Sequence, residues 1–224
     1  MINTHIKICG ITNLDDALVA AHSGADLLGF IFYSKSPRAV EPDVAAKIIA
    51  GIQEEFSLGS DPQPGGPHTV GVFVDESLEY IQRIQSKARF DYAQLHGDEQ
   101  PEMLQQMNGQ AYKVLRPSSQ DEATSQAASY ARLGIKDGPG WLIDAYDPNA
   151  YGGTGHKTDW RTAARLAHQY PGLLLAGGLT PENVVQAIET VQPWGVDVAS
   201  GVEAVPGKKD HEKVRKFIQR VKEL

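Results

Sequence analysis

The sequence lacks several features whose absence excludes whole classes of protein. Its 224 residues include one cysteine, so no disulfide can form within the chain and the reducing cytoplasm is the expected location. Asp and Glu number 28 against 21 Lys and Arg, which argues against a nucleic-acid-binding protein. No apolar run approaches the roughly 20 residues of a membrane span, and residues 1–10 do not resemble a signal peptide, so no membrane partner is expected.

Sequence patterns for metal and nucleotide binding are also missing. The one cysteine and seven histidines show no ligand spacing, so we expect no metal site. There is no Walker segment and no serine nucleophile elbow. The first strand-to-helix turn, residues 9–12, carries no glycine-rich dinucleotide fingerprint.

Short apolar segments alternate with amphipathic ones along the whole chain. Strands are predicted at 5–9, 28–33, 69–74, 92–95, 112–115, 141–144, 173–176 and 196–199. Helices are predicted at 13–23, 41–55, 77–88, 99–108, 120–133, 160–170, 181–192 and 210–222. Strict alternation predicts parallel strands joined by helices. Eight such units favour an α/β fold of the closed (β/α)8 TIM-barrel type, one domain over 1–224, over an open doubly wound sheet.

Residues at the segment boundaries support this interpretation. Asn13 and Ser77 are predicted helix caps, and Thr180 followed by Pro181 predicts the start of the seventh helix. Segment 57–68 is too rich in Gly, Pro and Ser for regular structure and is predicted to be a solvated loop. The pair at 208–209, both lysine, is expected to be solvated charge at the start of the last helix.

Glycines follow three of the late predicted strands. Residues 152–155 (GGTG) follow the sixth strand, Gly177 and Gly178 the seventh, and Ser200 and Gly201 the eighth. The loops after strands seven and eight are where a TIM barrel commonly binds phosphate. Glycine lets backbone N–H groups approach a ligand closely, so we expect a phosphate cradle and a phosphorylated small-molecule partner. The alternative is that these glycines serve turn geometry alone.

Cys9 ends the first predicted strand, at the end where barrels carry their active groups. Lys7 lies two residues earlier and shares its side of the strand. A neighbouring cation lowers the pKa of a thiol, so the pair predicts a reactive cysteine. The alternative is a small buried apolar residue, which is the more frequent role of a free cysteine. Asp197, in the last predicted strand, is expected to face Lys7 inside the closed barrel, more as a structural ion pair than in direct chemistry.

Three further polar residues follow or end strands. Asp144 ends the sixth, where a carboxylate is costly unless it points into a polar mouth or caps the next loop. Arg38 follows the second, where a guanidinium suits a substrate carboxylate, and the alternative is a solvated loop residue. His96 ends the fourth strand, and a hydrogen-bonded structural role is the usual one for a lone histidine.

A set of short segments carries a resemblance that covers nearly the whole chain. They are 7–12 (KICGIT), 29–32 (GFIF), 36–38 (SPR), 71–74 (GVFV), 94–97 (QLHG), 142–144 (LID), 151–155 (YGGTG), 159–160 (DW), 176–179 (AGGL), 181–184 (PENV), 201–203 (GVE) and 206–210 (PGKKD). In these the chain resembles the phosphoribosylanthranilate isomerase family of tryptophan biosynthesis. The first and last segments are specific together, whereas the glycine-rich ones recur in other phosphate-binding barrels.

The resemblance implies an Amadori rearrangement of N-(5-phosphoribosyl)anthranilate to the 1-deoxyribulose phosphate isomer, with no cofactor. It implies Cys9 as general base, Asp144 as general acid and Arg38 as the group that holds the anthranilate carboxylate. The residues implied to form the phosphate site are Gly155, Gly177, Gly178, Ser200 and Gly201. Lys7, His96 and Asp197 are candidate supporting residues.

Two other functions compete with this interpretation. The histidine-pathway phosphoribosyl sugar isomerase performs the same chemistry on a related barrel, but its base is typically an aspartate where this chain has Cys9. Its substrate also carries two phosphates, and the sequence contains one convincing cradle. The other is a non-catalytic phosphate-binding barrel. The sequence leaves the oligomeric state open.

Overall fold

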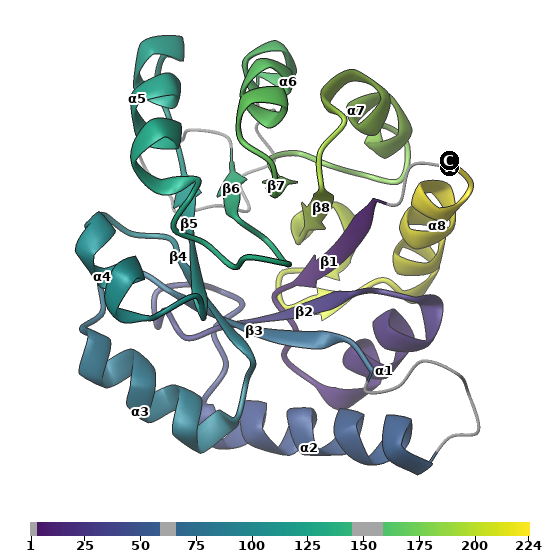
Figure 1. Ribbon diagram of the computed structural model, residues 1–224. Coiled ribbons are helices and arrows are strands. Elements are labelled where there is room, and N and C mark those ends of the chain that lie inside the picture. Colours follow the sequence, from purple (N-terminus) through teal and green to yellow (C-terminus); the bar gives the residue numbers. More distant parts are fainter. Residues whose placement is uncertain (1–3, 59–65, 145–158) are drawn as a thin grey trace.

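The computed structural model describes residues 4–58, 66–144 and 159–224, which form a closed barrel of eight parallel strands (Figure 1). Each strand pairs with the next, and the last pairs with the first. The strands are β1 (His5–Cys9), β2 (Leu27–Ile31), β3 (His68–Phe73), β4 (Tyr92–Leu95), β5 (Ala111–Leu115), β6 (Trp141–Ile143), β7 (Leu173–Leu175) and β8 (Gly195–Val198). The predicted (β/α)8 barrel is confirmed.

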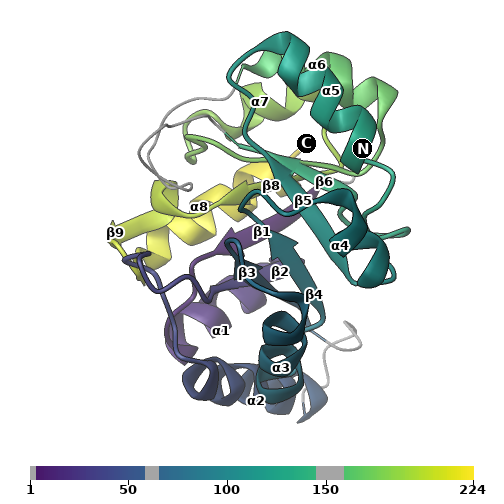
Figure 2. The ribbon, with the colours of Figure 1, turned by 90° about the vertical axis from the view of Figure 1, so that its left-hand side faces the viewer.

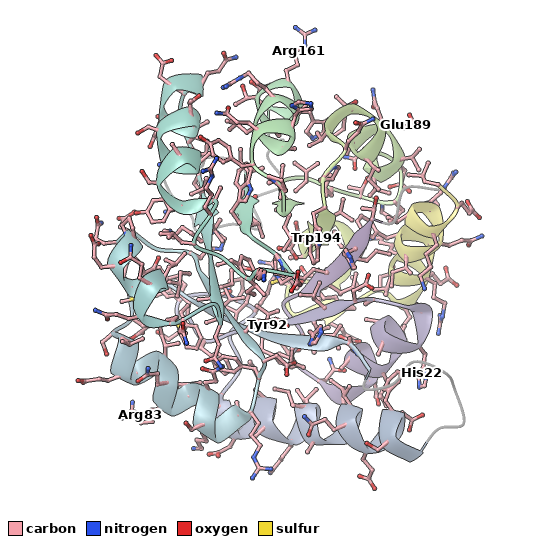
Figure 3. All side chains as sticks on the ribbon, in the orientation of Figure 1. His22, Arg83, Tyr92, Arg161, Glu189 and Trp194 are labelled. Carbon is pink, nitrogen blue, oxygen red and sulfur yellow. The ribbon has the colours of Figure 1, made fainter. Side chains whose placement is uncertain are left out.

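A ring of helices surrounds the strands, as Figures 1 and 2 show from two directions. The helices are α1 (Leu14–Ser23), α2 (Pro42–Leu58), α3 (Leu78–Ala88), α4 (Pro101–Gln106), α5 (Gln120–Tyr130), α6 (Trp160–Gln169), α7 (Val184–Val191) and α8 (His211–Lys222). Charged side chains such as Arg83, Arg161 and Glu189 point outward from this ring (Figure 3). Within the described ranges, every helix is too short or too polar to traverse a lipid bilayer.

The apolar side chains form two layers because each strand buries both of its faces. Ile6 and Ile8 of β1 point outward and belong to the larger cluster between strands and helices. A smaller cluster inside the barrel includes Leu27, Tyr112 and Leu174. Since alternate residues of a strand face opposite sides, Ile6 and Ile8 on the outside leave Lys7 and Cys9 to face the barrel interior.

Helix starts agree with the sequence in part. Asn13 caps α1 by accepting a hydrogen bond from the Asp16 N–H, and Ser77 caps α3. The prediction that the seventh helix begins at Pro181, with Thr180 as its cap, is wrong, because α7 begins at Val184. Residues 180–183 instead form a turn in which the Asn183 side chain accepts from the Thr180 N–H and donates to the Gly178 carbonyl. The loop predicted from residue 57 starts later, since α2 continues to residue 58.

Two short strands that the sequence analysis did not predict follow β8. A single 3₁₀ turn (Ser200–Val202) leads into β9 (Glu203–Val205), which pairs antiparallel with β10 (Lys208–Lys209). β9 lies at the left edge of Figure 2, before α8. The hairpin turns Lys209 back toward the barrel, where 2% of the residue is exposed. The expectation that this lysine is a solvated charge is therefore wrong.

The cap of α3 offers a direct stability test. Ser77→Ala removes the side-chain acceptor of the Tyr80 N–H and is expected to lower the free energy of unfolding by about 1 kcal/mol in urea denaturation. Ser86→Ala is the matched control, since Ser86 lies exposed inside the same helix, where alanine is the better helix former. An equal effect of both substitutions would show that capping does not stabilise this helix.

Candidate active site

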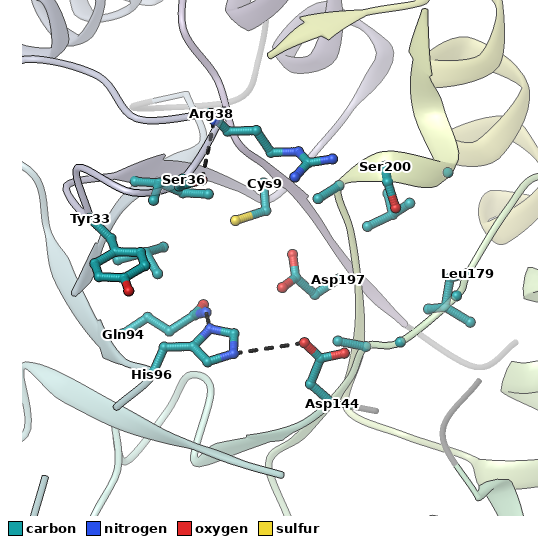
Figure 4. Close-up of a pocket in the computed structure, with 18 of the residues that line it drawn as sticks. Cys9, Tyr33, Ser36, Arg38, Gln94, His96, Asp144, Leu179, Asp197 and Ser200 are labelled. Atoms are coloured by element: carbon teal, nitrogen blue, oxygen red, sulfur yellow. Dashed lines mark hydrogen bonds and ion pairs between the residues drawn. The ribbon is translucent and has the colours of Figure 1, made fainter. Parts of the chain in front are cut away.

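A pocket opens at the carboxyl ends of the barrel strands, where parallel barrels place their reactive groups. β1 ends at Cys9, and Asp144 follows β6 directly. Figure 4 shows the Cys9 thiol and the Asp144 carboxylate pointing into the same opening from different sides. Other lining residues include Ile31, Tyr33, Ser36, Arg38, Val72, Val74, Gln94, His96, Gly177, Gly178, Asp197, Ser200 and Gly201. The predicted meeting of thiol and carboxylate on one rim is confirmed.

Lys7 and Asp197 form a buried ion pair beneath Cys9. Parallel pairing of β1 with β8 places the two residues opposite each other, and their N–O distance is 3.0 Å. The Lys7 side chain is wholly buried. Burial alone would lower the pKa of Lys7, but Asp197 together with Cys9 and Tyr112 raises that pKa above its usual value. The expected facing of Lys7 and Asp197 inside the barrel is confirmed.

The environment of Cys9 favours the thiol form. Burial raises the pKa of Cys9 above its ordinary value, and the carboxylate of Asp197 adds to this effect. The ammonium groups of Lys7 and Lys209 oppose the rise. Lys7 thus lowers the thiol pKa as its position in the sequence predicted, but burial outweighs the charge of this neighbour.

Gly29 of β2 provides the space that Cys9 and Lys7 occupy. A Cβ atom at this position would lie 2.7 Å from the Cys9 Sγ, 3.1 Å from the Cys9 Cα and 3.2 Å from the Lys7 Nζ. Such distances are shorter than van der Waals contact, so any larger residue displaces the thiol or the ammonium. This close approach explains why glycine occurs in the middle of a buried strand.

A buried polar chain connects His96 with the floor of the pocket. The Tyr112 hydroxyl donates to the Gln94 side-chain oxygen over 2.7 Å. The Gln94 amide nitrogen lies 3.3 Å from the His96 Nδ1. Because an amide NH₂ can only donate, the proton of a neutral imidazole lies on Nε2, which is 3.8 Å from the Asp144 carboxylate. Burial and the nearby cations Arg116, Lys113 and Lys7 hold the pKa of His96 well below its usual range.

Arg38 is held by Glu203 and is not a solvated loop residue. Its Nε and one terminal nitrogen donate to the two oxygens of the Glu203 carboxylate over 2.9 and 2.8 Å. Burial would raise the pKa of Glu203, but Arg38 and Lys209 lower that pKa below its ordinary value. The carboxylate thus remains ionised and orients the guanidinium beside the pocket.

The glycine loops lie where a phosphate would be expected. Gly177 and Gly178 adopt left-handed backbone conformations, with φ of 91° and 65°, that glycine enters without strain. Ser200 and Gly201 begin the 3₁₀ turn after β8, and all four residues line the pocket. Gly155, the remaining predicted member of the phosphate site, lies outside the described residues.

Four residues of this site were not assigned roles by sequence reasoning: Gln94, Tyr112, Glu203 and Lys209. Three of them lie in segments that carried the resemblance, 94–97, 201–203 and 206–210, so a signal was present. Spacing alone could not assign Glu203 and Lys209, because Arg38 lies 165 positions from Glu203 and Cys9 lies 200 positions from Lys209.

The comparisons with known proteins agree with this geometry. The family model for N-(5'-phosphoribosyl)anthranilate (PRA) isomerase matches residues 6–220. The chain belongs to the N-(5'-phosphoribosyl)anthranilate isomerase family. The isomerase of Geotalea uraniireducens is 44% identical over 221 residues, covering 99% of this chain and 100% of that protein.

Solved structures of the isomerase family share the fold. The phosphoribosyl anthranilate isomerase of Thermotoga maritima superimposes with a TM-score of 0.83 at 37% identity, covering 99% of this chain and all of that one. Another, at 36% identity and a TM-score of 0.79 with the same coverage, is a phosphoribosyl anthranilate isomerase in complex with reduced 1-(o-carboxyphenylamino)-1-deoxyribulose 5-phosphate.

The space at Gly29 can be tested by a double-mutant cycle. Gly29→Ala is expected to lower the free energy of unfolding by about 1–3 kcal/mol, because the added methyl group overpacks the site. In a Cys9→Ala background the loss becomes smaller, since the Sγ atom is gone. Denaturant unfolding of the four proteins measures the coupling. Equal losses in both backgrounds would show that the thiol does not occupy this space.

Proposed function

We propose that the protein isomerises N-(5'-phosphoribosyl)anthranilate to 1-(2-carboxyphenylamino)-1-deoxyribulose 5-phosphate in tryptophan biosynthesis. The observation that carries the proposal is a thiol and a carboxyl group, Cys9 and Asp144, on different sides of one pocket. An Amadori rearrangement needs one proton donor and one proton acceptor on a single substrate. Family membership favours the same reaction.

Asp144 acts first, as the general acid. Its carboxyl group protonates the ribose ring oxygen while the bond from that oxygen to C1 breaks. The lone pair of the anthranilate nitrogen forms the C1=N bond of an iminium ion. His96 supports this step as a neutral imidazole whose Nε2 faces the carboxylate at 3.8 Å. A neutral neighbour, unlike a cation, does not favour the ionised form of the acid.

Cys9 then acts as the general base. The thiol first gives up its proton to solvent, and the thiolate then removes the proton from C2. The electron pair of that C–H bond forms C1=C2 while the iminium electrons return to nitrogen. The enolamine tautomerises to the ketone. Because the iminium ion serves as the electron sink, the reaction draws on no cofactor. Lys7 supplies positive charge for the thiolate as it forms.

The two ends of the pocket differ in a way that suits this substrate. Gly177, Gly178, Ser200 and Gly201 receive the phosphate, mainly through backbone N–H groups, and Gly155 is proposed to join them. The opposite wall is apolar and accepts the anthranilate ring; it consists of Ile31, Tyr33, Val72 and Val74. Arg38, aligned by Glu203, binds the carboxylate of the ring.

The competing functions fit this site less well. The pocket holds Cys9 at the position where the histidine-pathway isomerase typically has an aspartate, so this site differs from that of the histidine-pathway isomerase. A silent phosphate-binding barrel does not require an acid and a base in one pocket. We propose a single domain that works in the cytoplasm, where a catalytic thiol stays reduced.

The acid and base roles predict a loss of turnover with binding retained. Cys9→Ala and Asp144→Asn are each expected to lower kcat by about 10²–10⁴-fold, measured by the loss of phosphoribosylanthranilate fluorescence. Asp98→Asn is the control for Asp144, because it removes a charge from an exposed position near the barrel mouth. Near-normal turnover by Cys9→Ala would eliminate the thiol as base.

Arg38 is predicted to act mainly in binding. Arg38→Ala removes the partner of the substrate carboxylate, so KM is expected to rise about 10-fold or more while kcat changes less. Lys35→Ala provides the control, since it removes a positive charge from an exposed position of the same loop. A steady-state titration distinguishes the two effects, and an unchanged KM would remove Arg38 from the site.

A further inference from the structure

Lys209 is a buried cation that the proposed reaction does not itself use. Its side chain is fully buried, and it is not among the described residues that line the pocket. It belongs to β10, so it approaches the barrel from the hairpin that follows β8. A buried ammonium group costs free energy unless its protons are bound, which makes its partners informative.

The three N–H groups of Lys209 contact three different segments. The Nζ atom donates to the Cys9 carbonyl over 2.6 Å, to the Ala199 carbonyl over 3.2 Å and to the Glu203 carboxylate over 3.1 Å. A neutral amine has only two protons and would leave one of these oxygens without its donor. Three acceptors around one nitrogen fit the ammonium form; burial lowers the pKa of Lys209 below its ordinary value, and the carboxylate of Glu203 opposes that effect. The charge lies directly behind the residue proposed as the base.

These contacts connect both halves of the proposed site. Cys9 ends β1, and Ala199 directly precedes Ser200 and Gly201 of the phosphate loop. Glu203 in turn orients Arg38 through its two oxygens. One ammonium group thus holds together the ends of two strands and the carboxylate that aligns the guanidinium.

The position of Lys209 itself is fixed by the helix ring. Its backbone N–H donates to the Asp16 carboxylate of α1 over 2.8 Å, and the His211 side chain lies 2.8 Å from the other oxygen of that carboxylate. A long, flexible side chain gains precision when its backbone is anchored in this way.

We propose that Lys209 is a positioning residue for the general base: it holds the Cys9 end of β1 and supplies the positive charge that favours the thiolate during catalysis. The proposal rests on the proposed function, in which Cys9 removes the C2 proton. Burial raises the pKa of Cys9, and Lys7 and Lys209 oppose that rise. The other charged and titratable groups that act on the thiol or line its pocket are Tyr33, Tyr112, Asp197, Arg38, His96 and Asp144.

The lone cysteine gives a readout that is independent of turnover. Because Cys9 is the single cysteine of the chain, the mass of one iodoacetamide adduct reports on this thiol alone. The alkylation rate follows the thiolate fraction, so its dependence on pH gives the thiol pKa. Lys209→Met keeps much of the length of the side chain and removes the charge.

In Lys209→Met the alkylation profile is expected to move to higher pH by about one unit. With such a shift, kcat falls about tenfold near neutral pH and recovers as the pH rises, while KM changes less. Lys208→Met, at the exposed neighbouring position, is the matched control and is expected to change neither quantity. A purely structural role would lower the stability without moving the profile.

A second variant covers the case in which the buried Glu203 prevents Lys209→Met from folding. Lys209→Gln retains two N–H donors and also removes the charge. If a variant folds and its alkylation profile equals that of the wild type, the proposal is overturned. If neither variant folds, the role of Lys209 is structural and the proposal is likewise overturned. If the wild type does not isomerise phosphoribosylanthranilate, the proposed function fails, yet the alkylation comparison still decides whether Lys209 acts on Cys9.

Discussion

Pairing of β8 with β1 is the constraint on which the rest of this molecule depends. It closes the sheet, and its register sets Lys7 against Asp197 inside the barrel. Both charges are buried, so each is tolerable only while the other is present. Without closure, Cys9 at the end of β1 would have neither Asp197 of β8 nor the proposed phosphate loop beside it.

Opposing electrostatic effects determine the pKa of Cys9, the proposed base. Burial and Asp197 favour the neutral thiol, while Lys7 and Lys209 favour the thiolate. A thiol that is neutral in the free protein is protected from unwanted reactions, and the charges required for its ionisation are already in place. Because these charges are fixed before the reaction, no solvent has to reorient around the thiolate as it forms.

The site is built from residues of three regions: the hairpin after β8, the rim of the barrel and the barrel interior. Glu203 and Lys209 come from outside the barrel, yet their side chains reach its rim and hold Arg38 and Cys9. The polar chain from Tyr112 through Gln94 to His96 does the same from the barrel interior toward Asp144. Buried hydrogen bonds thus hold Arg38 and the Cys9 end of β1, and they place His96 beside Asp144.

The sequence by itself determined the eight-unit barrel, the placement of Cys9 and Asp144 on one rim, and the facing of Lys7 and Asp197. These features follow from the hydrophobic periodicity of each segment and from the order of strands and helices along the chain. Alternating strands and helices predict parallel strands, and the carboxyl ends of parallel strands lie on one face of the barrel. The family resemblance also came from the residues alone and is confirmed.

Only the tertiary structure decided how the charges are paired and how strongly burial acts. Arg38 meets Glu203 across 165 positions of sequence, and Lys209 meets Cys9 across 200. No local pattern encodes contacts between residues so far apart in the sequence. Lys209, next to the start of the last helix, was therefore expected to be solvated, although the hairpin buries it. The direction of the Cys9 pKa shift depends likewise on desolvation, which is a property of the packed barrel and not of the neighbouring residues in the chain.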